Sequence, residues 1–276
     1  MRQYLKQCKP LVNVVHSIAH LRTQTKTLIF KHMPVWVDAF FLKIWYFRET
    51  GRIVDLHDPK GFNDKIQWSK LYDSTPIKTK LADKYEVREW VKETIGEQYL
   101  IPLLGMYDNV DDIDFDALPN QFAMKCNHGS GCNIIVKDKT KLDVEAAKKK
   151  LRVWMKENFA FKCGFELQYL LIKPKILIEK YMEDSFGELR DYKFLCFNGT
   201  PEIVWLDADR FVEHKRNVYD LNWKQLPWRI GAFKPFPSPE KPIILEKMVE
   251  LVKTLSKGFS AVRVDLYVIN QNIYFG

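Results

Sequence analysis

The sequence predicts an α+β fold, in which helices are combined with mostly antiparallel strands. Helical periodicity occupies much of the first half of the chain, whereas the second half contains short strands arranged as hairpins. The clearest hairpin joins residues 192–197 to residues 202–206 across Asn198-Gly199, a dipeptide that favours tight turns. This order differs from the regular alternation of strand and helix that a doubly wound parallel sheet requires.

Several helices are predicted from apolar spacing. Residues 1 to about 55 are expected to form irregular helices, and residues 77–95 a single helix with an apolar stripe that ends at Gly96. Asp143 is placed to cap a helix that runs to about residue 158. A further helix is expected at residues 242–256, close to Gly258.

The predicted strands surround a glycine-rich turn and continue to the last residues. Strands are expected at residues 101–104, 122–126, 133–136 and 175–179, with residues 127–131 as the turn. Residues 262–269 and 273–275 form another expected hairpin. We expect three regions: a helical region at 1–60, a lobe with the glycine-rich turn at 61–182 and a second lobe at 183–276.

The composition favours a folded protein with anionic partners. The chain has 276 residues, of which 46% are hydrophobic, and a net charge of +8. Its five cysteines contain no CxxC pair, so a disulfide framework or zinc site is not expected. Since no signal peptide is evident either, the expected location is the cytoplasm, with the inner face of the membrane as an extension.

The aromatic stretch at residues 28–47 is the most apolar part of the sequence. It contains Lys31, His32, Asp38 and Lys43, and these charges argue against a membrane span. A packing helix is therefore expected. A helix lying on the membrane surface is the alternative, because the first fifty residues are basic and rich in aromatic side chains.

Lys125 and the glycine-rich turn form a candidate phosphate site. Glycines at 129 and 131, on either side of Ser130, would let backbone N–H groups approach an anion, and a lysine on the preceding strand would add charge. The GxxxxGK[ST] spacing of a Walker loop is absent. An ordinary glycine hairpin is the equally weighted alternative.

Arg263 and Asp265 form a second candidate site. They are two residues apart on a predicted strand, so their side chains project from the same face. A carboxylate beside a guanidinium suits a magnesium–phosphate centre, although a surface ion pair would look the same. A third feature is the buried strand at 176–178, which runs into polar residues and could mark a hinge.

The order of these motifs resembles the ATP-grasp superfamily, and within it the TupA-like family, named for teichuronopeptide biosynthesis. The resemblance covers residue 60 to the end. The segments that carry it are Leu-Ala-Asp-Lys-Tyr at 81–85, Lys-Cys-Asn-His-Gly-Ser-Gly at 125–131, Asp-Tyr-Lys-Phe at 191–194, Asp-Arg-Phe at 209–211 and Arg-Val-Asp-Leu-Tyr at 263–267.

The resemblance implies an ATP-grasp fold, in which two lobes with mainly antiparallel sheets clasp ATP, and it implies roles for individual residues. Lys84 and Lys125 would contact ATP phosphates beneath the loop of Gly129, Ser130 and Gly131. Asp265 would bind Mg²⁺, with Arg263 near the γ-phosphate. Four residues would form the hinge that reads adenine: Glu179, Lys180, Tyr181 and Met182. Asp191 would lie near the ribose, an assignment weakened by a different length of the preceding loop.

The implied chemistry is the formation of an acyl phosphate from a carboxylate, followed by attack of an amine. The expected setting is cell-surface polysaccharide or teichuronopeptide-type polymer synthesis. A cation-rich segment suits a carboxylate or acidic-sugar substrate, through Asp209, Arg210, His214 and Arg216. In the family pattern Tyr-Phe-Gly is followed by a metal-binding glutamate, whereas this chain ends at Gly276, so we expect it to be truncated there.

Two other classes of function remain open. Asp207-Ala208-Asp209 is a D-x-D sequence of the kind that holds a metal in glycosyltransferases, but no nucleotide-binding α/β half precedes it. A non-catalytic module that binds an anionic surface would also suit the charge. Nucleic acid is not an expected partner, since the basic residues are dispersed and no nucleic-acid motif is present.

Overall fold

A computed structural model of the chain describes residues 30, 32–162, 164–183, 190–208, 213–227, 231 and 233–276. The fold is α+β, as the sequence predicts. The chain divides into two compact units. Unit 1 contains the described residues up to Val87 together with Leu104–Glu179, and unit 2 contains Arg88–Leu103 with the described residues of Lys180–Gly276. Each unit is treated by itself below.

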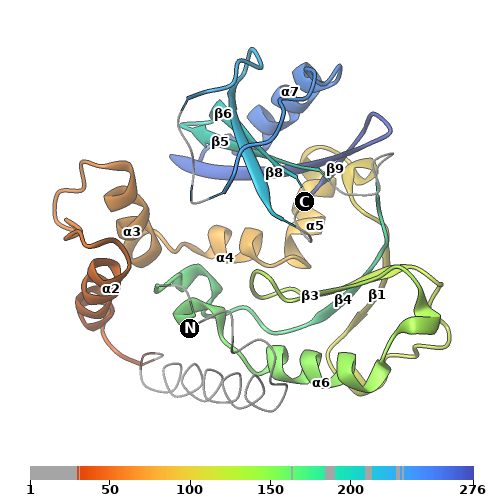
Figure 1. Cartoon of the computed structure of the whole chain (residues 1–276). Coiled ribbons are helices and arrows are strands. Elements are labelled where there is room, and N and C mark those ends of the chain that lie inside the picture. The colour runs from red at the N-terminus through yellow and green to blue at the C-terminus, as the bar shows by residue number, and fades with distance from the viewer. Residues whose placement is uncertain are drawn as a thin grey trace. The chain divides into compact units, whose positions relative to one another are not determined.

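The first helices of unit 1 form an aromatic core. α2 (Val35–Thr50) packs beside α3 (Phe62–Tyr72), as Figure 1 shows. Its buried side chains lie on one face, because Ala39, Leu42 and Tyr46 recur at helical spacing. They contact Phe161 and Phe165 from a later part of the chain. This region also includes the short 3₁₀ helices η5 (Phe159–Phe161) and η6 (Leu167–Tyr169).

The single helix predicted at residues 77–95 is wrong, because the structure divides it into α4 (Pro76–Ala82) and α5 (Glu86–Thr94). The cause is Asp83, whose backbone is extended and whose Oδ1 accepts from the N–H groups of Tyr85 (2.8 Å) and Glu86 (3.4 Å). An aspartate that caps the first turn of a new helix ends the preceding one. Lys84 therefore lies in a break between helices.

A four-stranded sheet forms the rest of unit 1, in the order β1-β4-β2-β3. Its strands are β1 (Leu103–Tyr107), β2 (Phe122–Cys126), β3 (Asn133–Val136) and β4 (Ile176–Lys180). β2 and β3 have the predicted bounds, whereas β1 begins two residues later than predicted. The 3₁₀ helices η3 (Val110–Asp112) and η4 (Lys139–Lys141) lie in the connections.

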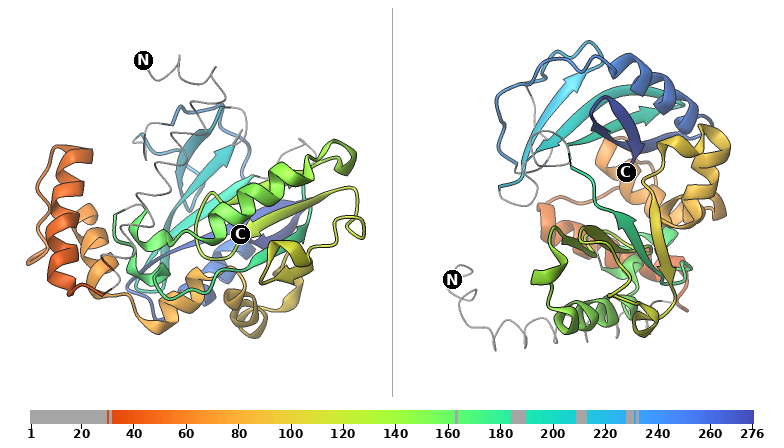
Figure 2. Two further views of the ribbon diagram at one scale, coloured as in Figure 1. Left: turned by 90° about the horizontal axis from the view of Figure 1, so that it is seen from below. Right: turned by 90° about the vertical axis from the view of Figure 1, so that its right-hand side faces the viewer.

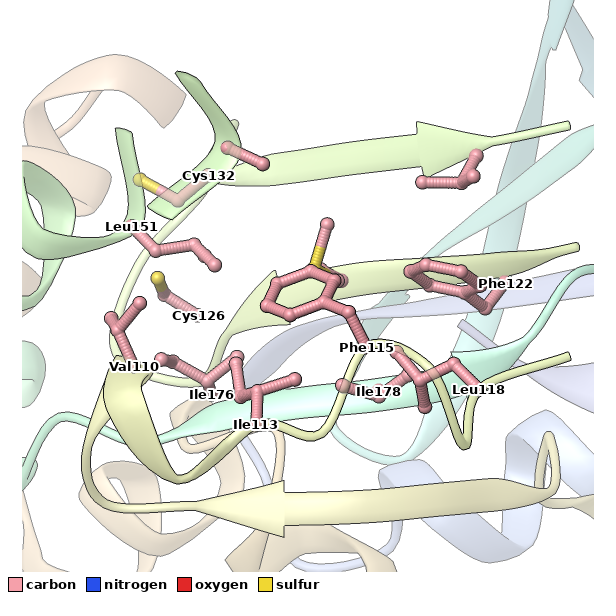
Figure 3. Packing of buried hydrophobic residues seen from close by; sticks show 13 residues of the cluster. Val110, Ile113, Phe115, Leu118, Phe122, Cys126, Cys132, Leu151, Ile176 and Ile178 are labelled. Carbon is pink, nitrogen blue, oxygen red and sulfur yellow. The ribbon is translucent and has the colours of Figure 1, made fainter. Parts of the chain in front are cut away.

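α6 (Val144–Met155) supplies a helical layer for the core of this sheet. Its N-terminus is capped as predicted, since Asp143 Oδ1 accepts from the Ala146 N–H at 2.9 Å. Leu151 of α6 lies in one cluster with Phe122, Ile176 and Ile178 of the strands. Figure 3 shows this cluster, in which the sulfurs of Cys126 and Cys132 lie among the apolar side chains.

Unit 2 is built around a five-stranded antiparallel sheet, in the order β7-β6-β5-β8-β9. Its strands are β5 (Asp191–Phe197), β6 (Thr200–Ala208), β7 (Lys215–Asp220), β8 (Ala261–Ile269) and β9 (Asn272–Phe275). The predicted turn between β5 and β6 is confirmed, with positive φ at both Asn198 and Gly199. β7 was not predicted, and Arg216 lies on this strand.

The two faces of this sheet differ in chemistry. α7 (Leu245–Ser256) packs on β5, β6 and β8 (Figure 2). Its buried side chains include Met248 and Val252. The strands turn apolar residues such as Phe194, Leu206 and Val264 to one face, and the register places Lys193, Asp207 and Asp265 on the opposite one. η2 (Glu97–Tyr99) also belongs to this unit. Within the described ranges no helix is both long and apolar enough to cross a membrane.

Candidate functional site

Lys125 and Glu179 form an ion pair on neighbouring strands of unit 1. Lys125 is the penultimate residue of β2, and its Nζ lies 2.6 Å from Oε2 of Glu179 on β4. Both side chains are largely buried, and β2 and β4 are hydrogen-bonded neighbours in the sheet. Two residues that the family resemblance assigned to phosphate and to adenine are thus in direct contact.

Lys84 adds a second cation to this part of unit 1. Its Nζ donates to the carbonyl oxygen of Gly129, so the lysine reaches the glycine-rich turn directly. Loss of hydration and repulsion from Lys125 lower the pKa of Lys84 below its ordinary value. Lys84, Lys125, Glu179 and Gly129 therefore form one cluster, with two lysines and one carboxylate.

The turn itself depends on its glycines for two different reasons. A Cβ at Gly129 would lie 2.7 Å from the ring of Phe159, so no larger residue fits there. Gly131 has φ of +77°, in the left-handed region that glycine adopts without strain. Ser130, between them, is exposed. The turn thus exposes the Ser130 hydroxyl, while its backbone at Gly129 packs closely against the ring of Phe159.

Asn127 is a structural residue for which sequence reasoning gave no role. It is fully buried, and its Nδ2 donates to Asp83 Oδ1 and to the carbonyl of Lys173, each at 2.9 Å. Its Oδ1 accepts from the N–H of Lys175 at 2.6 Å. In addition, its carbonyl accepts from the N–H of Lys84. Asn127 therefore ties the helix break that carries Lys84 to the turn after β2.

His128 supports the same turn from inside. Its Nε2 lies 3.1 Å from the carbonyl oxygen of Trp154 at the end of α6. Burial lowers the pKa of His128, which favours the neutral ring. A neutral ring with its proton on Nε2 donates to this carbonyl, so His128 serves the packing of the turn.

The expected hinge coincides with the boundary between the two units, which falls between Glu179 and Lys180. The Lys180 N–H donates to the carbonyl oxygen of Pro102 at 2.9 Å. The hydroxyl of Tyr181 donates to Glu183 at 2.7 Å, and Met182 is half-buried. Apart from Glu179, whose carboxylate contacts Lys125, these residues belong to unit 2.

Lys193 lies at the centre of the polar face of the sheet in unit 2. Its Nζ contacts Asp191 on the same strand, and it lies 3.2 Å from Asp207 and 3.9 Å from Asp265. β5 pairs with both β6 and β8, and the register brings the three carboxylates together around the lysine. Asp191, which the resemblance assigned to the ribose, is buried in this cluster. Sequence reasoning had placed Lys193 in a motif without giving it a role.

Asp207 is held by Arg216, Lys193 and His214. Arg216 makes two contacts with it, Nε to Oδ1 at 2.5 Å and Nη2 to Oδ2 at 2.8 Å, and His214 Nε2 lies 3.1 Å away. Burial raises the pKa of Asp207, but Arg216 and Lys193 outweigh it and lower the pKa to about 2. The Arg216 guanidinium also lies over the rings of Trp205 (5.1 Å) and Phe233 (4.4 Å).

Arg263 and Asp265 form the bidentate pair that their spacing suggested. Arg263 Nε lies 2.6 Å from Oδ1 and Nη2 lies 2.8 Å from Oδ2, on a partly exposed part of β8. The structure therefore brings together Asp191, His214, Arg216, Arg263 and Asp265 of the predicted residues. Asp209 and Arg210 lie outside the described residues.

The fit of a magnesium ion can be judged from the carboxylates. Among the residues that the structure describes, no group of three or more His, Cys, Asp or Glu side chains could hold a metal. Magnesium that is bound together with a nucleotide requires fewer protein ligands, because one or two carboxylates are combined with phosphate oxygens and waters. Asp265, the most accessible of the three carboxylates around Lys193, fits that kind of site.

Solved structures with similarity to this chain include several ligases. D-alanine–D-alanine ligase from Bacillus anthracis is 18% identical with a TM-score of 0.39, over 71% of this chain and 55% of that one. L-amino acid ligase from Bacillus licheniformis is 12% identical with a TM-score of 0.42, over 73% and 41%. The ATP-grasp ligase PsnB, in a complex with Mg and ADP, is 11% identical with a TM-score of 0.38, over 77% and 55%. The chain thus spans about half the length of these structures.

Comparison with curated proteins found no match. The sequence profile of one family, described as TupA-like ATPgrasp, matches residues 64–276, which is most of the chain. This range contains both the lysine cluster of unit 1 and the polar sheet face of unit 2. The chain therefore belongs to the TupA-like ATP-grasp family.

Proposed function

We propose that this protein is an ATP-dependent ligase that joins a carboxylate to an amine through an acyl phosphate. The observation that carries the proposal is the cluster of Lys84 and Lys125 at the glycine-rich turn, within the family match. Lys125 pairs with Glu179 there, and burial together with repulsion from Lys125 lowers the pKa of Lys84. A polyphosphate would relieve this repulsion, which is why the site suits an anion.

In the proposed site, Lys84 and Lys125 bind phosphate oxygens, and the Ser130 hydroxyl and backbone N–H groups of the turn complete the cradle. The segment from Glu179 to Met182 would contact the adenine, and Asp191 the ribose. Asp265 would hold magnesium, which supplies charge neutralisation on the phosphates when it is bound. Arg263 would face the transferring phosphoryl group once its contact with Asp265 loosens.

The proposed reaction balances in two steps. An oxygen of the substrate carboxylate attacks the γ-phosphorus, and the bond between that phosphorus and the β–γ bridging oxygen breaks to release ADP. The nitrogen of an amine then attacks the acyl carbon, inorganic phosphate leaves and the nitrogen loses a proton. Arg216 and His214, with Arg210 and Asp209 beside them in the sequence, would orient the carboxylate or acidic-sugar substrate.

We propose cell-surface polysaccharide or teichuronopeptide-type polymer synthesis as the setting, from the family's name alone. The glycosyltransferase alternative gains no support from the structure. Asp207, the first residue of the D-x-D sequence, uses both carboxylate oxygens on Arg216 and contacts Lys193 as well. Asp265 has similar partners, but the Asp207 side chain is only 1% exposed, against 20% for Asp265, so Asp207 is the less available of the two to a metal.

Binding of Mg·ATP tests the proposal. We expect Mg·ATP to raise the melting temperature of the full chain, since a ligand that binds only the folded state stabilises it. Lys125→Ala and Asp265→Asn should each remove most of that rise. Lys141→Ala is the matched control, because Lys141 is a surface lysine of unit 1 with only a weak ion pair. Its response to Mg·ATP should equal that of the wild type.

Turnover is tested by supplying hydroxylamine with candidate carboxylates and measuring hydroxamate and ADP together. An acyl phosphate predicts equal amounts of both products. Stabilisation by a UDP-sugar but not by Mg·ATP would contradict the proposal and favour the glycosyltransferase. Mg·ATP stabilisation that survives Lys125→Ala would instead contradict the assigned phosphate site.

A further inference from the structure

The outward face of α2 carries a row of large apolar side chains. Trp36, Phe40 and Phe47 are 72%, 57% and 54% exposed, and Ile44 is exposed beside them. At about 100° per residue, these four positions fall within roughly 80° of arc around the helix. We call them the α2 stripe. It lies away from the buried face of Ala39, Leu42 and Tyr46, and none of its four residues belongs to the cluster that this face forms with other described residues of unit 1.

Cations border the stripe on both sides. Lys43 and Arg48 are exposed and lie about 60° and 80° from its middle, in opposite directions. The acids of α2 are placed elsewhere: Asp38 is buried, and Glu49 lies on the far side of the helix from the stripe. Furthermore, residues 1–37 contain six lysines and arginines in total and no acidic residue. These six positive charges account for most of the net charge of +8.

We propose that the α2 stripe docks this protein on an anionic lipid surface, with α2 lying in the plane of the membrane. Aromatic side chains bordered by Lys and Arg suit the boundary between headgroups and acyl chains, where rings are buried and cations meet lipid phosphates. The stripe runs over twelve residues, from Trp36 to Phe47, a length of roughly 17 Å, which suits a helix parallel to the surface. The whole of α2 precedes residue 64, where the family match begins, so the stripe is separate from the proposed ATP site.

A second copy of the chain is a poorer occupant of this surface. The exposed parts of four such side chains supply roughly 400 to 500 Å² per partner, against the ~800 Å² of a standard interface. Lys43 and Arg48 would also meet their own like charges around a two-fold axis. An anionic bilayer turns the same two cations into attractive contacts.

Cosedimentation of the full chain with vesicles tests the proposal. We expect binding to phosphatidylcholine vesicles that contain roughly 30 mol% phosphatidylglycerol, weak binding to pure phosphatidylcholine, and loss of binding at about 0.5 M salt. The variant Trp36→Ala/Phe40→Ala/Phe47→Ala should bind at least about tenfold more weakly. Lys43→Gln/Arg48→Gln should weaken binding about fivefold for each charge removed.

The control variant is Leu171→Ala/Ile243→Ala, which removes two apolar side chains that are 75% and 87% exposed outside α2. It should bind vesicles within about twofold of the wild type. The proposal is overturned if the wild type stays in the supernatant, or if the aromatic variant binds as well as this control. A dimer in light scattering that the aromatic variant loses, without vesicle binding, would also overturn it and assign the stripe to a second copy. The charge variant gives an independent result should the aromatic variant fail to fold.

Discussion

At the scale of single residues, Asp38 shows how burial alone changes a carboxyl group. It lies on the inner face of α2, its Oδ1 has no hydrogen-bond partner within the described part of the chain, and desolvation raises its pKa to about 6. A carboxyl with a raised pKa favours folding when it is protonated and opposes folding when it is ionised. The loss of folding stability caused by Asp38 is therefore absent at low pH and grows as the pH rises from 3.8 to about 6.

Asp38→Asn should remove this pH dependence. The free energy of unfolding of the wild type, relative to the variant, should fall by about 2 kcal/mol between pH 4 and pH 8. Urea unfolding at both pH values, followed by circular dichroism, measures the difference. The comparison between pH values cancels the constant cost of placing an amide at this position. A difference that is the same at pH 4 and pH 8 would show that Asp38 ionises as freely as a surface carboxyl.

At the scale of elements, the accuracy of the sequence prediction depended on how local the cause was. β2 and β3 around the glycine turn, and the hairpin at Asn198-Gly199, follow from residues next to one another. The break at Asp83 was missed because its cause is not local. Asp83 caps the first turn of α5 and so ends α4, and its side chain is held in place by Asn127, 44 residues away in the sequence. β7 was missed because its Lys-Arg-Asn-Val-Tyr-Asp sequence shows no clear alternation, and only pairing with β6 makes it a strand.

The same distinction applies to the candidate site. The spacing of Arg263 and Asp265 is enough to predict a shared face, and the structure confirms their pairing. The cluster of carboxylates around Lys193 requires the register of three strands, which no single segment specifies. The contact of Lys84 with Gly129 likewise depends on how the chain returns to the turn.

Asn127→Ala should disturb two elements together, because the side chain links the break before α5 to the start of β4. The substitution leaves buried backbone groups without partners, and we expect a loss of about 3 kcal/mol. Asn133→Ala, at an exposed position on β3, should cost less than about 0.5 kcal/mol. Hydrogen exchange of residues 83–86 and 127–131 should accelerate together in Asn127→Ala. Faster exchange in only one of these segments would contradict the link.

At the scale of the whole molecule, two buried carboxyl groups favour an acidic optimum of stability. Asp38 opposes folding increasingly above pH 3.8, whereas Asp207, with its pKa lowered to about 2, supports folding fully above pH 3.8. Asp207 loses that support only as the pH falls from 3.8 to about 2. Together these two groups favour a maximum of stability near pH 4, in contrast to the neutral optimum of a protein whose carboxyls all gain ion pairs.

Arg216→Ala tests the acidic limit of this stability. Removal of one partner from a buried ion pair typically costs about 3 to 5 kcal/mol, because the carboxylate stays buried. Without Arg216, burial raises the pKa of Asp207, so the chain should unfold at a higher pH during acid titration. Arg152→Ala is the control, since the pair between Arg152 and Asp111 is exposed and should contribute less than about 1 kcal/mol. Circular dichroism between pH 1.5 and pH 6 should therefore show a shifted acid transition for Arg216→Ala alone. Equal acid transitions in the two variants would mean that Lys193 and His214 hold Asp207 without help from Arg216.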